Sequence, residues 1–260
     1  MTYCVSVCLN SGLVFCSDSR TNAGPDMIST YSKMHIFNHR KDRLFVVLSA
    51  GNLATTQAIV NRLRRDIEDE ATRSLYTVSK MVDAAQYVGE ISREEQTKAS
   101  SAMAGTNVDT SATLIFGGQI KGTEPTIYLI YAAGNFISCS QHSPYLQIGE
   151  SKYGKPILDR ILTRGTSIAD AARCAIVSMD STLRANATVG PPIEVLIYER
   201  DTFEADHYIR MDEDDDYLRA IKQAWNEKIK QAFLDLPTFD WEERSLGQDT
   251  GPVETGVGAC

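Results

Sequence analysis

The sequence lacks any long apolar run, and its cysteines lack a metal-binding or redox pattern. No apolar stretch approaches the ~18 residues that a membrane-spanning helix requires, so we expect no transmembrane segment. The six cysteines form no CxxC pair and show no zinc-ligand spacing; they are Cys4, Cys8, Cys16, Cys139, Cys174 and Cys260. The first three lie within apolar stretches, where a reduced cysteine behaves as a small hydrophobic residue. A reducing cytoplasm is the simplest setting for such a chain.

Basic charge is scarce relative to acidic charge. The 26 Lys and Arg residues are outnumbered by 34 Asp and Glu residues, which gives a net charge of −8. This balance argues against nucleic acid and against an anionic membrane as partners. Residues 1–16 are apolar but lack the positive region and the cleavage pattern of a signal peptide. No nucleotide-binding motif is present, so ATP-driven unfolding would need a separate ATPase; neither a cofactor nor a metal is expected.

Hydrophobic periodicity divides the chain into strands and helices. Alternating patterns predict strands over 3–9, 13–19, 34–37, 43–50, 112–120, 126–134, 135–140, 145–149, 192–200 and 206–211. Patterns with a 3.6-residue period predict helices over 53–73, 77–96, 152–162, 167–183 and 217–233. This order indicates an α+β fold of two mainly antiparallel sheets packed face to face, with helices on both outer faces. No linker or repeat interrupts it, so we expect one domain over 1–244 and a disordered, Gly-rich tail over 245–260.

The first predicted hairpin carries an acid and a base toward the start of the chain. In the first strand large apolar residues alternate with small or polar ones, and Thr2 belongs to the small set. A three-residue loop over 10–12 would place Cys4 opposite Asp18 and Thr2 opposite Arg20. Asp18 would then be a diagonal neighbour of Thr2 on the same face of the sheet.

Lys33 reaches the same place if the strand that follows it lies beside the second strand. Asp18 would then hold the ammonium in position. If Met1 is removed, Thr2 offers a hydroxyl nucleophile, and its free α-amine, which titrates near ~7.7–8, can act as the base with Lys33 nearby. The spacing also permits a simpler interpretation, in which Asp18 and Arg20 form an edge-strand ion pair and Lys33 is a solvated charge.

These residues together resemble the N-terminal half of proteasome β-type subunits, which belong to the N-terminal-nucleophile hydrolases. The likeness rests on the threonine behind Met1, the SDSR segment at 17–20, Lys33, and the LSAG segment at 48–51. It extends over roughly residues 2 to 235 of this chain. The resemblance implies a four-layer α-β-β-α sandwich, in agreement with the layer order expected from periodicity.

The resemblance also implies roles for individual residues. It assigns the nucleophile to Thr2, the lysine-positioning aspartate to Asp18, the activating lysine to Lys33 and the oxyanion-binding backbone N–H to Gly51, at the start of the first helix. The serine that contacts the α-amine falls on Glu150 or Ser151, and a second aspartate falls on Asp180. The family's serine three residues after that aspartate is Leu183 here, although Ser181 is nearby. The GSG-type turn of the family is absent, because the chain reads Ile-Gly-Glu-Ser at 148–151.

The function implied is a threonine-type endopeptidase that acts on peptides or unfolded proteins inside a homo-oligomeric ring or spiral. Two alternatives remain open: a scaffold or binding assembly that keeps the fold with weak or no activity, and an amide hydrolase for small metabolites. We expect the apolar stripe of the last helix and the aromatic segment at 239–241 to lie at subunit contacts.

Overall fold

The computed structural model describes residues 1–22 and 28–239, and the chain divides into two units, Met1–Arg219 and Ala220–Cys260. The expected single domain over 1–244 stays a prediction. The predicted tail at 245–260, together with Asp240 and Trp241, lies outside the described residues. No helix in the described ranges is both long enough and apolar enough to cross a membrane.

The first unit contains two five-stranded antiparallel sheets. The first sheet has the strand order β10-β1-β2-β11-β12, formed by Tyr145–Gly149, Tyr3–Cys8, Gly12–Asp18, Ile193–Glu199 and His207–Met211. The second has the order β5-β6-β7-β8-β9, formed by Met34–Arg40, Arg43–Gly51, Ala112–Ile120, Thr126–Ile130 and Phe136–Ser138. A short hairpin of β3 (Arg20–Asn22) and β4 (Ile28–Thr30), which the periodicity does not predict, follows β2.

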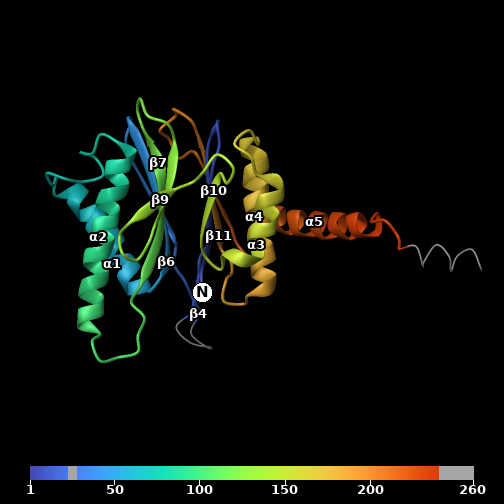
Figure 1. Ribbon diagram of the computed structural model, residues 1–260, viewed down its shortest axis with the longest axis horizontal. Coiled ribbons are helices and arrows are strands. Elements are labelled where there is room, and N and C mark those ends of the chain that lie inside the picture. The colour runs from blue at the N-terminus through green and yellow to red at the C-terminus, as the bar shows by residue number, and fades with distance from the viewer. Residues whose placement is uncertain (23–27, 240–260) are drawn as a thin grey trace, which may run out of the picture. The chain divides into compact units, whose positions relative to one another are not determined.

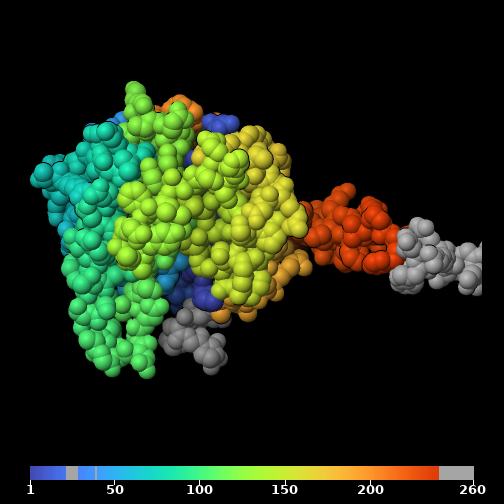
Figure 2. Space-filling view, viewed as in Figure 1, coloured from blue at the N-terminus to red at the C-terminus, as the bar shows by residue number. Residues whose placement is uncertain are grey.

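Helices cover both outer faces of the paired sheets (Figure 1). The second sheet packs against α1 (Leu53–Glu68) and α2 (Met81–Ala102), and the first against α3 (Ser151–Ile161) and α4 (Ile168–Ala185). In the space-filling view, the green segment that includes β7 to β9 separates the surfaces of these two helix layers (Figure 2). The predicted α+β, four-layer α-β-β-α sandwich is therefore confirmed. The last helix, α5, spans Asp216–Leu234.

In the described part of the chain, two large apolar clusters lie between the layers. One lies between the sheets and contains Cys4, Phe15, Leu48 and Ile115. The other lies between the second sheet and its helices and contains residues such as Phe116 and the α1 and α2 side chains that repeat at helical spacing. Because burial removes apolar surface from water, these cores fix which face of each strand points inward.

The first hairpin departs by one residue from the predicted register. β1 and β2 pair Cys4 with Ser17, so the turn contains two residues rather than three. The Leu9 N–H donates to the Gly12 carbonyl at 2.9 Å and closes this turn. Gly12 permits the tight closure because its φ is 152° and a Cβ there would lie 2.0 Å from the Tyr198 carbonyl oxygen.

The expected pairs of Cys4 with Asp18 and of Thr2 with Arg20 are therefore wrong. In the observed register Cys4 lies opposite Ser17, and the backbone N–H of Tyr3 donates to the Asp18 carboxylate at 3.0 Å. The strand after Lys33 also differs from expectation, because β5 pairs with β6 in the second sheet rather than with β2. Lys33 consequently approaches Asp18 from the opposite sheet.

Candidate active site

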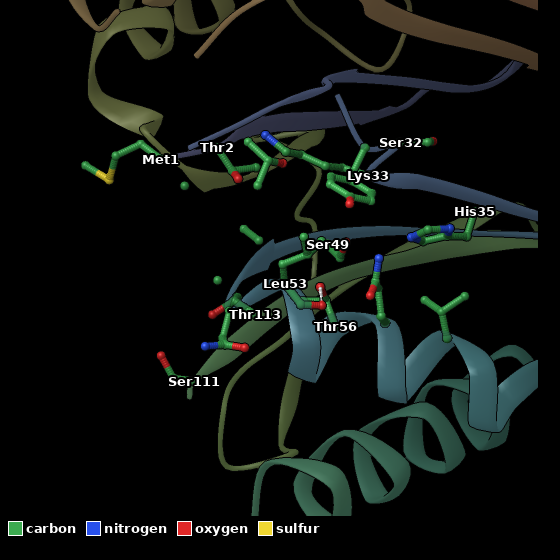
Figure 3. A pocket seen from close by; sticks show the side chains of 18 of the residues that line it. Met1, Thr2, Ser32, Lys33, His35, Ser49, Leu53, Thr56, Ser111 and Thr113 are labelled. Carbon is green, nitrogen blue, oxygen red and sulfur yellow. Dashed lines mark hydrogen bonds between the residues drawn. The ribbon is translucent and has the colours of Figure 1, made fainter. Parts of the chain in front are cut away.

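A cavity of about 1000 Å³ opens at the end of the sandwich where β1 begins. Its walls come from both sheets and from the first turns of α1, and Thr2, Lys33, Gly51 and Gly149 are among its lining residues. Figure 3 shows Thr2 and Lys33 on one wall, facing the wall that carries Leu53 and the other labelled α1 and second-sheet residues. The predicted nucleophile, lysine and oxyanion glycine thus share one cavity.

Lys33 and Asp18 form a buried ion pair beside Thr2. The Lys33 ammonium donates to Asp18 Oδ1 at 2.7 Å and to the Arg20 carbonyl oxygen at 2.7 Å. Asp18 is fully buried, and its carboxylate also accepts the backbone N–H groups of Tyr3 and Gly190. Burial raises the pKa of Asp18, whereas the Lys33 ammonium acts in the opposite direction. A solvated Lys33 is excluded, because only 6 % of this residue is exposed.

The simpler interpretation of Arg20 is also excluded by geometry. Its guanidinium donates to the Ala187 carbonyl oxygen at 3.0 Å instead of pairing with Asp18, whose ion-pair partner is Lys33. The guanidinium packs closely over Gly190, where a Cβ would lie 2.2 Å from Arg20 atoms. Arg20 lines the cavity and offers its carbonyl oxygen to Lys33. Arg20 therefore contacts the Lys33 ammonium through its backbone carbonyl oxygen and not through its side chain.

Thr2 is held through its own backbone by the end of β10. The Glu150 N–H donates to the Thr2 carbonyl oxygen at 2.8 Å. Gly149 has φ 80°, and a Cβ on it would lie 1.9 Å from the same oxygen. Only glycine permits this approach, so the Ile-Gly-Glu-Ser segment positions Thr2 through main-chain atoms. Thr2 itself is half-buried and lines the cavity.

Gly51 lies on the opposite wall, at the end of β6 rather than within the first helix. Its φ is 117°, and a Cβ there would lie 2.3 Å from the Ser111 carbonyl oxygen. The helix begins at Leu53, and Asn52 caps it by accepting the Thr55 N–H. Gly51 is thus two residues ahead of the first helical residue, and the expected place at the helix start is corrected to the strand end.

Glu150 and Ser151 follow Gly149, at the end of β10 that contacts Thr2. Neither is among the described residues that line the cavity. The Glu150 side chain is buried and lies 4.0 Å from the Lys152 ammonium. Ser151 is the first residue of α3, and its carbonyl oxygen accepts the Gln147 amide. The structure therefore assigns Glu150 a backbone contact with Thr2.

Asp180 and Ser181 lie late in α4, and neither belongs to the described lining of the cavity. The buried Asp180 carboxylate accepts a hydrogen bond from Arg184 Nε at 2.9 Å, one helical turn away. The Ser181 hydroxyl donates to the Val177 carbonyl oxygen at 3.1 Å. These contacts connect both side chains to their own helix.

A buried carboxylate that the motif analysis does not single out lies behind the ion pair. Glu194 in β11 is 3 % exposed and accepts hydrogen bonds from Ser17 at 3.5 Å, Ser19 at 3.2 Å and Ser32 at 2.8 Å, and from Tyr208. The sequence does carry a signal for Glu194, because an acidic residue inside an apolar strand pattern is buried and therefore needs hydrogen-bond partners. This network ties the end of β2 to the residue preceding Lys33.

His35 forms part of the cavity wall farther from Thr2. Burial lowers its pKa to about 4, and the Arg64 guanidinium acts in the same direction. His35 is therefore a neutral group at neutral pH. Among the described residues, no group of three or more His, Cys, Asp or Glu side chains is placed to hold a metal ion.

Comparison with known proteins places this geometry in a family. The model of the proteasome subunit family matches residues 2–198. The solved structure of Anbu (ancestral beta-subunit) from Yersinia bercovieri is 47% identical, with a TM-score of 0.86 over 92% of this chain and 99% of that chain. The helical assembly of the Anbu complex from Pseudomonas aeruginosa is 46% identical, with a TM-score of 0.87 over 92% and 98%.

A third solved structure, Anbu from Hyphomicrobium sp. strain MC1, is 42% identical, with a TM-score of 0.83 over 92% of this chain and 100% of that chain. No curated protein matches the chain. The sandwich fold, the shared cavity and these similarities lead to one conclusion: the chain belongs to the proteasome subunit family, in its bacterial Anbu group.

Proposed function

We propose that the chain is a threonine-type peptidase of the N-terminal-nucleophile class, with Thr2 as nucleophile after removal of Met1. The observation that carries the proposal is the buried Lys33–Asp18 pair at the cavity wall beside Thr2. A buried ion pair contributes little stability compared with apolar residues of similar size, because both charges lose their hydration. Such a pair in a cleft, next to a hydroxyl, is typical of a catalytic site.

The reaction would begin with attack of Thr2 Oγ1 on the scissile carbonyl carbon. The hydroxyl proton passes to the free α-amine, and the Lys33 ammonium stabilises the developing alkoxide. The Gly51 N–H donates to the oxyanion of the tetrahedral intermediate. The C–N bond then breaks as the α-ammonium protonates the leaving amine. Water hydrolyses the resulting ester and restores the Thr2 hydroxyl.

Removal of Met1 is required by this chemistry. While Met1 is attached, the Thr2 nitrogen is an amide and has no basic lone pair for the hydroxyl proton. Met1 also lines the cavity, on the same wall as Thr2 (Figure 3). The free α-amine titrates near ~7.7–8, which suits a base or proton relay at neutral pH.

We further propose that the substrates are peptides or unfolded proteins and that the active form is a cytoplasmic homo-oligomer, in a ring or a spiral. The Pseudomonas aeruginosa relative is described as a helical assembly. Enclosure would protect folded cellular proteins from a nucleophile at the edge of a sheet. Any ATP-driven unfolding would be supplied by a separate ATPase.

A second candidate is a proteasome-fold scaffold with weak or no activity. It is favoured by the four supporting residues Glu150, Ser151, Asp180 and Ser181, which do not belong to the described cavity lining. The two candidates differ in whether Thr2 becomes a free, reactive N-terminus.

Intact-protein mass spectrometry with a peptide β-lactone, which acylates a nucleophilic hydroxyl, tests the proposal. We expect a mass lower by one methionine residue, and one lactone adduct per chain. Thr2→Ala should lose the adduct, whereas Thr113→Ala, which changes another threonine of the cavity wall, should keep it. A chain that retains Met1, or an adduct that persists in Thr2→Ala, would favour the scaffold.

A further inference from the structure

Two cysteines far apart in the sequence meet one arginine at the other end of β1. Arg164 lies in the connection between α3 and α4, and its two terminal nitrogens donate to Cys8 Sγ at 2.9 Å and to Cys139 Sγ at 3.3 Å. The two sulfurs thus share one guanidinium, and the Cys8 thiol itself donates to the Pro125 carbonyl oxygen at 3.4 Å. Both sulfurs are free thiols at the edge of the core between the sheets.

This cluster is separate from the proposed catalytic cavity. Cys8 ends β1 and Tyr3 begins it, so about 17 Å of extended strand separates the two sites. None of the three cluster residues belongs to the described lining of the cavity. The cluster therefore has its own environment and its own access to solvent.

The arginine charge is unbalanced in this environment. Within the part of the chain that the structure describes, Arg164 forms no ion pair, and its Nε is buried without a hydrogen-bond partner. A thiolate beside it would supply the missing negative charge and accept charge-assisted hydrogen bonds. The guanidinium thus favours ionisation of a neighbouring sulfur.

The pKa values of the two thiols are shifted in opposite directions. The proximity of Cys8 and the Arg164 charge lower the pKa of Cys139 to about 7, although burial acts against them. The proximity of Cys139 and burial raise the pKa of Cys8, which is 1 % exposed. Cys139 is half-buried and remains reachable from solvent. One sulfur is thus suited to react first, and the other lies protected next to it.

We propose that Cys139 is a peroxide-reactive thiolate and that Cys8 resolves it to a Cys8–Cys139 disulfide, with Arg164 as the positioning residue. The Cys139 thiolate attacks a hydroperoxide: an S–O bond forms, the O–O bond breaks, and the alkoxide or hydroxide leaves and takes a proton from water. Sulfur is oxidised by two electrons as the peroxide is reduced. Cys8 then attacks the sulfenic sulfur, the S–S bond forms, and hydroxide leaves with the thiol proton as water.

Peptide mapping of the full chain after treatment with hydrogen peroxide tests this inference. The expected result is a non-reduced peptide linking Cys8 to Cys139, which disappears after reduction. In Cys8→Ser, dimedone should trap a sulfenic acid on Cys139, because the resolving thiol is missing. Cys174 is the matched control: it is 4 % exposed, burial raises its pKa to about 12, and it should stay unmodified.

Arg164→Gln tests the role of the guanidinium. Without the charge, the pKa of Cys139 should return toward the ordinary ~8.5, so a smaller fraction of Cys139 is thiolate at pH 7. The higher nucleophilicity of each thiolate offsets only part of this loss, so the rate at pH 7 should fall about threefold or more. Arg164→Lys should restore part of the rate. Circular dichroism establishes that each variant is folded. Absence of the linked peptide, equal labelling of Cys139 and Cys174, or an unchanged Arg164→Gln rate would overturn the proposal.

Discussion

At the scale of single residues, charge burial dominates the proposed active site. The Asp18 carboxylate is fully buried, so its charge is stabilised by the Lys33 ammonium and two backbone N–H groups rather than by solvent. Glu194, by contrast, is held by hydroxyl groups. The two carboxylates therefore respond differently to substitution of their partners.

Lys33→Ala and Thr2→Ala should separate stability from activity. Both should reduce peptide hydrolysis to background. Lys33→Ala should also lower the free energy of unfolding by about 3–5 kcal/mol, because it leaves the Asp18 carboxylate buried without its cation. Thr2→Ala removes a half-buried hydroxyl and should change stability little. Peptide turnover and urea denaturation measure the two effects, and wild-type turnover in Lys33→Ala would refute the activation mechanism.

His35 should make the chain more stable as pH rises from about 4 to 6.5. Its pKa is lowered from 6.5 to about 4 in the folded chain, so the unfolded chain binds more protons in this window. Stability from this residue is therefore lost on acidification and constant above about pH 6.5. His35→Gln should flatten the curve of melting temperature against pH within that window. Two parallel curves would show that His35 is not the group responsible.

At the scale of secondary-structure elements, the end of β10 fixes the start of β1. Gly149 and Gly122 both have positive φ, 80° and 83°, but only Gly149 approaches another backbone. A Cβ at Gly149 would lie 1.9 Å from the Thr2 carbonyl oxygen, and none of the atoms around Gly122 lies within 4 Å of its Cβ position. Substitutions at Gly149 and Gly122 can therefore separate the cost of backbone strain from the cost of steric overlap.

Gly149→Ala should therefore cost more than Gly122→Ala. Both substitutions place a Cβ in the left-handed region, at about 1–2 kcal/mol. The overlap with Thr2 should add at least about 1 kcal/mol in Gly149→Ala and reduce peptide turnover, because the nucleophile is displaced. Chemical denaturation and turnover of the two variants test this. Equal stability and equal activity would mean that β10 does not position Thr2.

At the scale of the whole molecule, the second unit exposes apolar side chains. Ile229, Phe233, Leu234 and Leu236 are each more than half exposed, at 51%, 72%, 74% and 58%. Contiguous exposed apolar groups are typical of protein interfaces. We therefore expect the C-terminal part of α5 to lie at subunit contacts of a homo-oligomer larger than a dimer.

Ile229→Asp should dissociate this oligomer, because it would bury an unpaired carboxylate at the contact. The association constant should fall at least about tenfold, which corresponds to about 1.4 kcal/mol. Gln231→Asp adds the same charge on roughly the opposite side of the helix and should leave assembly intact. Sedimentation velocity of the full chain measures both variants. A monomeric wild-type chain, or equal dissociation of the two variants, would disprove the contact.

The sequence by itself determined the helices, most of the strands and the layer order, and it indicated Thr2, Lys33 and Gly51, which line one cavity. Alternation in the first strand and helical spacing around Ile59 and Leu63 are local patterns, and they specify which side chains can be buried. The helix predicted over 77–96 is shifted, to Met81–Ala102, because polar residues after Lys98 continue it on the solvent side. The contact between Lys33 and Asp18 follows from residue types whose pairing is chemically favoured.

Only the tertiary structure decided the register, the direction of approach and the long-range contacts. Nothing local distinguishes a two-residue from a three-residue turn before Gly12; packing of Gly12 against Tyr198 does. Lys33 reaches Asp18 from the other sheet because the sheets stack face to face. Glu194 with Ser32, and Arg164 with Cys8, meet across more than 100 residues of chain, so their contacts depend on how whole layers pack.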